Sequence, residues 1–271
     1  MTTQRHALVT VNVHGLGPEE RETPPESLFG RFGHGRYTYN VGLQRVLDFL
    51  RGNGIRGTFF WPVVEARRCP DLLRACMADG HEIASHGLAF EDISKLGDQE
   101  ADLLKQAKQQ LEDLCGQAVH GFRAPEGLVS LDTVRILQDL GYVYDSSYID
   151  DDAPYSLVSD NAARMVELPW SEGLSDITHF RRRFTQGRAA LALRAEFQGL
   201  IEAEGYACLS LHPRGDIGSG RAARLEMLQG LIADIRASGA SFTRAIDLAR
   251  TCLVDGTVQW QGRTRAIASW A

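Results

Sequence analysis

The run Ala7-Leu8-Val9-Thr10-Val11-Asn12-Val13 decides the fold class of this chain. Apolar and β-branched residues fill most of it, which predicts a strand buried on both faces, as in a parallel sheet. Polar residues mark its end at Asn12 and His14, and a long segment containing several Gly and Pro follows at 15–39. Loops of that length in a compact domain are usually functional, so we expect chemistry at this end of the strand.

The rest of the chain alternates between predicted helices and strands. Such alternation predicts an α/β fold with a mainly parallel sheet and helices outside it. At 271 residues the chain has the length of one α/β barrel, and no linker, low-complexity stretch or repeat divides it, so one domain at 1–271 is predicted. Helices are predicted at 40–53, 70–78, 98–114, 130–140, 189–203, 221–238 and 243–249, and further strands at 57–62, 81–85, 119–123, 142–144, 164–168 and 206–211.

Composition and charge exclude several classes of partner. The formal net charge is −6, which argues against a nucleic-acid partner. No apolar run approaches the ~18–20 residues of a membrane span, and the polar start of the chain does not resemble a signal peptide. The five cysteines are scattered, odd in number and without a Cys-x-x-Cys pair, which suits a reducing compartment. A cytoplasmic protein with a small-molecule substrate is therefore predicted.

Polar side chains follow several predicted strands. In a closed sheet the carboxyl ends of the strands meet at one rim, so we expect these side chains to converge there. Taken singly, each has a simpler reading, since a histidine at a strand end is more often held by structural hydrogen bonds, and an Asp-Ser-Ser sequence often forms a turn. The residues in question are Asn12, His14, His86, Arg123, Asp145 and His212.

The order of these segments resembles the motif series of the polysaccharide deacetylases, which contain the NodB homology domain. The resemblance extends from about residue 7 to residue 250 and implies a distorted (β/α)7-type barrel. Two stretches, 82–87 and 144–155, are similar to the intracellular branch of the family, which includes metal-independent allantoinases, cyclic imide hydrolases and peptidoglycan-deacetylase-like proteins. Members of that branch tend to be oligomers, so the resemblance implies a homo-oligomer, a dimer or a tetramer. The matching segments are Asn12-Val13-His14, Ser85-His86-Gly87-Leu88-Ala89-Phe90, Arg123-Ala124-Pro125, Asp145-Ser146-Ser147 and Leu209-Ser210-Leu211-His212-Pro213.

The sequence departs from the family at the metal site. The resemblance places Asn12 where the family has its general base, and an amide does not accept a proton at neutral pH. His14 stands where the family has a metal-binding Asp, His86 keeps the first metal histidine, and Phe90 replaces the second. A catalytic zinc needs three protein ligands. The prediction is a site that requires no cofactor, and the alternative is zinc or another divalent metal on His14 and His86, with a third ligand from Glu91, Asp92 or the 15–39 segment.

The leading hypothesis is hydrolysis of an amide, imide or ureide C–N bond in a small polar molecule. His212 is the predicted general acid and base, because an imidazole titrates closest to neutral pH. His86 is the second candidate for activating water, and Asn12 would donate to the oxyanion, as His14 would if protonated. Arg123 would orient the substrate or hold a carboxylate, and Asp145 would orient Arg123 or a histidine. Phe90 and Trp170 would form an apolar wall.

Two other functions remain open on the sequence. One is a metal-dependent deacetylase of an N-acetylated sugar or sugar nucleotide. The other is a non-catalytic binding or assembly protein that keeps the barrel. The retention of Arg123, Asp145 and His212 in their motifs speaks against the second.

Overall fold

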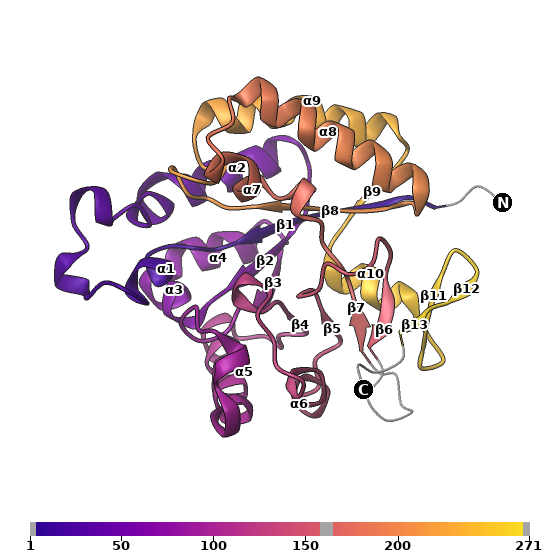
Figure 1. Cartoon of the computed structure of the whole chain (residues 1–271), viewed down its shortest axis with the longest axis horizontal. Helices are drawn as coiled ribbons and strands as arrows, with labels where there is room; N and C mark the ends of the chain where they lie inside the picture. The colour runs from indigo at the N-terminus through magenta and orange to yellow at the C-terminus, as the bar shows by residue number, and fades with distance from the viewer. Residues whose placement is uncertain (1–3, 158–164, 268–271) are drawn as a thin grey trace.

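A curled, mainly parallel sheet forms the centre of the computed structural model, which describes residues 4–157 and 165–267 (Figure 1). Seven of its strands run parallel, each paired with the next, in the order β8-β1-β2-β3-β4-β5-β7. An antiparallel strand, β6, extends the sheet at β7, and β13 pairs with β6. The bounds are β1 His6–Asn12, β2 Thr58–Trp61, β3 Glu82–Ser85, β4 Gly121–Phe122, β5 Tyr144–Asp145, β6 Tyr155–Leu157, β7 Val166–Glu167, β8 Tyr206–Leu211 and β13 Ala266–Ile267.

Helices cover the outer face of the sheet. Two long helices, α8 and α9, lie together on one side of the molecule, and α4, α5 and α6 lie on the other (Figure 1). The first segment between β1 and α2 projects from one end of the molecule (indigo in Figure 1). The bounds are α1 Gly17–Glu20, α2 Leu43–Gly52, α3 Val63–Arg68, α4 Pro70–Ala78, α5 Glu100–Cys115, α6 Thr133–Asp139, α7 Asp176–Arg181, α8 Gln186–Ala203, α9 Ala222–Ala237 and α10 Ala245–Cys252.

Alternation along β1 separates the two faces of the sheet. Side chains at successive positions of a strand point to opposite faces. Val9 and Val11 belong to the core between the sheet and the outer helices, whereas Leu8 belongs to a second core inside the curled sheet. The inner core also contains residues of α10 and Trp260, which close the bottom of the half-barrel. The inner positions that follow Leu8, two residues apart, are Thr10, Asn12 and His14, and all three are buried and polar.

The predicted barrel is confirmed, in the form of a half-barrel. β8 and β13 lie at the two ends of the strand order and do not pair with each other, so the sheet curls without closing. Every helix and strand predicted above has a counterpart, most of them within three residues at each end. Three groups of elements were not predicted: the short helices α1, α3 and α7, strands β6, β9 (Ser241–Thr243) and β13, and the small sheet of β10 (Leu253–Val254), β11 (Thr257–Trp260) and β12 (Arg263–Thr264).

The described helices include none with the length and apolar character that crossing a membrane requires. This agrees with the absence of a long apolar run in the sequence.

Gly121 in β4 leaves room for the ring of Tyr144 to pack directly on the backbone of the sheet. A Cβ atom at this position would overlap the ring of Tyr144, whose hydroxyl donates to Glu82 at 2.8 Å. We expect Gly121→Ala to lower the free energy of unfolding by about 2–3 kcal/mol, because an overpacked buried site forces neighbours off their rotamers. Urea titration followed by circular dichroism measures this change. Gly187→Ala in α8, where a Cβ meets nothing within 4 Å, is the control and should be neutral or slightly stabilising; an equal loss in both variants would contradict the steric explanation.

Candidate active site

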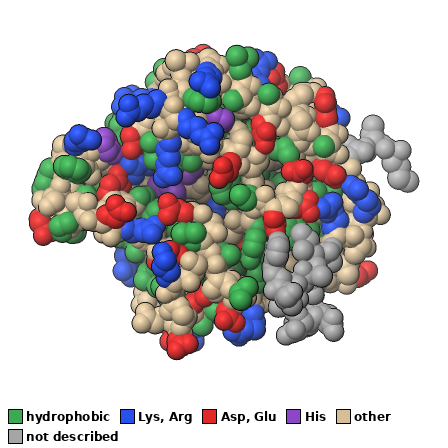
Figure 2. All heavy atoms as spheres, viewed as in Figure 1, with side chains coloured by type: hydrophobic (Ala, Val, Ile, Leu, Met, Phe, Trp, Pro, Cys, Tyr) green, Lys and Arg blue, Asp and Glu red, His purple; other side chains and the backbone are tan. Residues whose placement is uncertain are grey.

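A cavity of about 170 Å³ opens at the carboxyl ends of the strands. Figure 2 shows histidine side chains at the base of a hollow on this face, with basic and acidic side chains around it. All of the predicted site residues except Asp145 line the cavity, so the structure brings together positions that lie 200 residues apart. The predicted residues among its walls are Asn12, His14, His86, Phe90, Arg123, Trp170 and His212.

Arg123 lies at the base of the cavity and directs its donors into the protein. Its Nε donates to the carbonyl of Ser146 at 2.8 Å, and Nη2 donates to the hydroxyl of the same residue at 2.7 Å. Its Nη1 lies 3.0–3.2 Å from oxygen atoms of Thr10, Asn12 and Ser210. Nη2 also donates to Cys208 Sγ. A guanidinium has five N–H groups, and all five are engaged in these contacts. The prediction that Arg123 holds a substrate carboxylate is therefore not supported by its geometry.

The Asn12 amide fixes the protonation of His212. An arginine can only donate, so the Asn12 oxygen must face Arg123 and the Asn12 NH₂ group must face the other way. That NH₂ group lies 3.0 Å from Ser210 Oγ and 3.1 Å from His212 Nε2. His212 Nε2 therefore accepts, and the proton of a neutral His212 sits on Nδ1.

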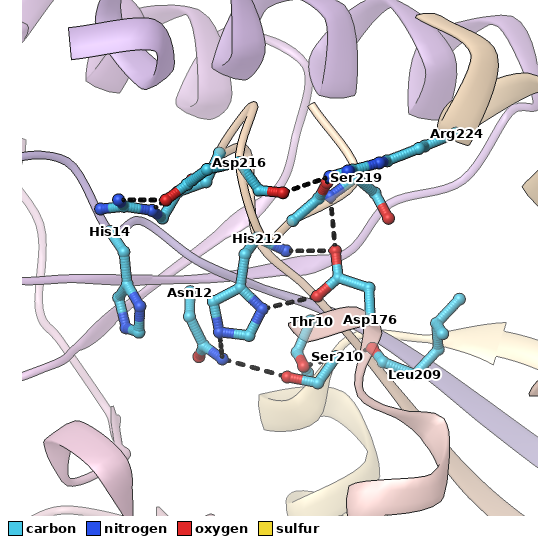
Figure 3. Close-up of polar contacts among 12 residues, drawn as sticks. Thr10, Asn12, His14, Asp176, Leu209, Ser210, His212, Asp216, Ser219 and Arg224 are labelled. Carbon is cyan, nitrogen blue, oxygen red and sulfur yellow. Dashed lines mark hydrogen bonds and ion pairs between the residues drawn. The ribbon is translucent and has the colours of Figure 1, made fainter. Parts of the chain in front are cut away.

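Asp176 holds the other side of His212 (Figure 3). Its Oδ1 accepts from His212 Nδ1 at 2.7 Å, and its Oδ2 accepts from the backbone N–H groups of His212 and Ser219 at 2.9 and 2.8 Å. Asp176 is fully buried, so these donors replace its hydration. Asp176 and His212 thus form a carboxylate–histidine pair, in which the carboxylate fixes both the position and the tautomer of the imidazole.

Asp176 is a site residue that was not predicted. It opens α7, and no helix was predicted between the strand at 164–168 and the helix at 189–203. The sequence does contain a helix-start signal at this point, since Ser175 and Asp176 are common capping residues and precede the apolar Ile177 and Phe180. What the sequence does not encode locally is that Ser175 forms a β-bridge with Ser210, which carries α7 to the end of β8.

His14 and His86 form a second imidazole pair. Their rings stack at 5.2 Å between centroids, and their Nε2 atoms lie 3.0 Å apart. His86 Nδ1 lies 2.6 Å from the carbonyl oxygen of Arg123 and must donate to it, so a neutral His86 accepts at Nε2 and His14 donates there. Burial lowers the pKa of His86 to about 3 and the pKa of His14 well below 6.5, with His212 adding to both shifts. Both rings are neutral at neutral pH, and a protonated His14 as oxyanion donor is not supported.

Phe90 occupies the space beside these imidazoles. Its ring meets the edge of the His14 ring at 4.6 Å between centroids, and the side chain is buried. Its φ angle of 71° lies in the left-handed region, which costs about 1–2 kcal/mol for a residue with a Cβ. With Trp170 on the cavity wall, Phe90 supplies the apolar surface that the sequence predicted.

The residues around His14 and His86 do not fit a zinc site of three protein ligands. The described part of the chain contains no cluster of three or more His, Cys, Asp or Glu side chains with the placement to hold a metal. Glu91, a candidate third ligand, instead accepts from the backbone N–H groups of Leu88 and Ala89 at 2.7 and 2.6 Å. Asp92 pairs with Lys95 and Ser94, away from the imidazoles.

A second cavity of about 260 Å³ adjoins the first and shares four wall residues with it, namely His14, Phe90, Ile177 and Arg181. Arg214, which is 3% exposed, lies on its wall. The guanidinium donates to Glu19, Asp216 and the Gly15 carbonyl at 2.5–3.0 Å. This clamp fastens the segment after β1 to the loop after β8.

Comparison with known proteins agrees with this geometry. The sequence profile described as polysaccharide deacetylase matches residues 22–144. Over 93% of its length the chain superposes on 91% of the crystal structure of a candidate polysaccharide deacetylase from Mycobacterium smegmatis, with a TM-score of 0.83 and 29% identity.

The chain is thus similar to the polysaccharide deacetylases, in sequence over residues 22–144 and in fold over most of its length.

The fold also resembles that of an enzyme whose name gives a different activity. The PuuE allantoinase superposes with a TM-score of 0.77 and 25% identity over 90% of this chain and 89% of that one. A peptidoglycan deacetylase-like protein of Gibberella zeae is 34% identical over 125 residues, which are 45% of this chain and 37% of the relative. The chain spans less than half the length of the curated relatives it matches first.

Asp145 lies behind the site and does not line the cavity. It follows Tyr144, which faces the inner core, so its own side chain points to the opposite face of the sheet. Its Oδ1 accepts from Ser146 N and Ser147 Oγ, and Ser147 Oγ in turn accepts from the backbone N–H of Ala124 at 2.8 Å. No hydrogen bond or ion pair joins Asp145 to Arg123 or to a histidine among the described residues, so any orienting effect on Arg123 is indirect: Asp145 holds Ser146, which accepts from Arg123.

Asp145 shares a proton with Glu167. The two residues are opposite each other in β5 and β7, where a proton between their carboxyl groups would let one donate to the other. If both were ionised, one oxygen of each would be buried without a donor. Burial raises the pKa of Asp145 to about 6, and burial with the Asp145 charge raises that of Glu167 well above 4.5. One proton therefore remains in the pair near neutral pH.

This pair predicts a pH-dependent contribution to stability. Folding raises both carboxyl pKa values. The stabilisation from the bound proton is therefore complete at a pH below the pKa values of the unfolded chain, and it is lost as the pH rises through the pKa values of the folded protein. Glu167→Gln keeps a donor to Asp145 at every pH. Between pH 5 and pH 8 the wild type should lose on the order of 1–3 kcal/mol more unfolding free energy than this variant, measured in urea at each pH. Parallel curves for the two proteins would show that the pair shares no proton.

Proposed function

We propose that this domain hydrolyses an amide, imide or ureide C–N bond in a small polar molecule, without a metal. The observation that carries the proposal is the His212–Asp176 pair at the cavity base, with a defined tautomer and an unprotonated Nε2. Support for the reaction class comes from similar proteins, which are named as deacetylases and an allantoinase. Support for the absence of a metal comes from the ligand set, which does not fit zinc.

His212 would act as general base and then as general acid. Nε2 accepts the proton of the attacking water as its oxygen bonds to the substrate carbonyl carbon. Asp176, which accepts from Nδ1, stabilises the imidazolium that forms. The same proton then passes to the leaving nitrogen as the C–N bond breaks, which returns His212 to its starting state.

Asn12 would couple this proton to stabilisation of the oxyanion. In the resting site one Asn12 N–H donates to His212 Nε2 at 3.1 Å. An imidazole nitrogen has one lone pair, so the Asn12 contact must break before Nε2 can take the proton of the water. Its N–H is then available to donate to the oxygen of the tetrahedral intermediate, and one such donor contributes about 10²–10³ in rate.

The cavity suits a compact substrate. Its volume of about 170 Å³ is below the range of drug-sized pockets. A ring or short chain with an amide-type carbonyl fits within it, with Phe90 and Trp170 as apolar walls. Imide and ureide carbonyls are more electrophilic than those of N-acetyl amides, so they require less activation than a metal supplies.

Substitutions at the pair test the roles of both residues. With the substrate found by screening imides, ureides and N-acetyl sugars, His212→Ala should lower kcat by several orders of magnitude. Asp176→Asn should lower it about 10²–10⁴-fold, because it favours the wrong tautomer. As a positioning residue, Asp176 should also shift the His212 tautomer in ¹⁵N NMR, which a purely structural role would leave unchanged. His34→Ala, outside the cavity, is the control; wild-type turnover in His212→Ala would refute the assignment.

Metal removal tests the second part of the proposal. Treatment with a strong chelator followed by gel filtration should leave kcat unchanged, and added zinc should not raise it. Elemental analysis of the same samples relates activity to metal content. Activity that is lost with the metal and restored by zinc would instead establish the metal-dependent deacetylase.

A further inference from the structure

Arg181 stands where the two adjoining cavities meet. It is the last residue of α7, it is exposed, and it lines both cavities. Within the residues that the structure describes, its guanidinium has no hydrogen-bond or ion-pair partner. Its charge is nevertheless felt inside the cavity, since it is one of the causes that lower the pKa of His14.

The other arginines around the cavities have partners. Arg123 donates to the network at the base, and Arg214 to Glu19 and Asp216. Arg21 pairs with Glu126 at 2.7 Å. Arg224, near the Asp176 end of the site in Figure 3, donates to two backbone carbonyl groups. Arg181 is thus the arginine on the cavity walls with donors still available in the described structure.

Thr178 adds a hydroxyl to the same helix face. It lies three residues before Arg181, so both side chains emerge on one side of α7, and both line the first cavity. The same helix begins with Asp176, which orients His212. A ligand held by Thr178 and Arg181 is therefore placed relative to the reactive imidazole by one short rigid element.

We propose that Arg181, with Thr178, binds a carboxylate group of the substrate at the rim of the catalytic cavity. The inference rests on the proposed function, because it describes the substrate of that site. A guanidinium presents two parallel N–H donors that match the two oxygens of a carboxylate. The substrate class is then a small amide, imide or ureide that carries an acidic side group.

The acidic residues nearby set the orientation of such a ligand. Glu19 and Glu126 are paired with arginines, whereas Glu172 on the first cavity wall has no side-chain partner in the described part of the chain. Like charges repel, so a ligand carboxylate would lie toward Arg181 and away from Glu172. His14 and His86 at the base are neutral and do not attract a carboxylate, so the uncharged carbonyl end of the ligand would enter the cavity.

Binding of a matched pair of probes tests the proposal. Hydantoin-5-acetate carries a carboxylate, and hydantoin-5-acetamide has the same ring and a neutral side group. Isothermal titration of wild-type protein should give a Kd about fivefold lower for the acetate than for the acetamide, and salt should reduce the difference. In Arg181→Gln the preference should disappear, while binding of the acetamide stays unchanged.

Arg182→Gln is the matched control, because Arg182 is the adjacent exposed arginine and does not line either cavity. It should keep the preference for the acetate. Equal Kd values for the two probes in wild type, no binding of the acetate, or a preference that persists in Arg181→Gln would each overturn the proposal. The titration needs no turnover, so a protein that binds the acetate through Arg181 and hydrolyses neither probe would contradict the proposed hydrolysis alone.

Discussion

One asymmetric amide governs the chemistry of this site. Asn12 has an oxygen that must face Arg123 and an NH₂ group that must face His212, because arginine can only donate. From that constraint follow the unprotonated Nε2 of His212 and the Nδ1 proton that Asp176 accepts. A carboxylate at position 12 would accept where the amide donates, so the proton arrangement of the whole base of the cavity would differ.

This polar network lies directly above an apolar plug. The inner positions of β1 change from Leu8 to Thr10 and Asn12 within five residues, and those of β8 change from Cys208 to Ser210 and His212. The lower positions pack against α10, which excludes water from below, and the upper ones contact one another, Arg123, Asp176 and the cavity. Buried polar groups of this kind are tolerated because nearly every donor has an acceptor. The half-barrel therefore serves as a rigid support for the imidazoles rather than as an enclosed chamber.

The sequence predicted the fold and seven of the fifteen residues that line the first cavity, for identifiable reasons. Alternating helices and strands imply a parallel sheet, and a parallel sheet brings strand ends together, which located His86 and His212 at one site. The exceptions have separate causes. Asp176 reaches the site through a long-range bridge that no local pattern encodes. Asp145 was misplaced although two-residue alternation after Tyr144 already directs it to the outer face. The engagement of every Arg123 donor depends on partners from three segments, β1, Ser146 and β8, which periodicity cannot supply.

The clamp around Arg214 bears on how molecules reach the imidazoles. It ties Glu19, in the long excursion after β1, to Asp216 in the loop after β8, so both flanks of the opening are fastened to each other. With both flanks held in this way, a solute can enter without a prior movement of either loop. Association rates should then follow diffusion and the sign of the solute's charge, with ionic strength as the main influence on how fast the site fills.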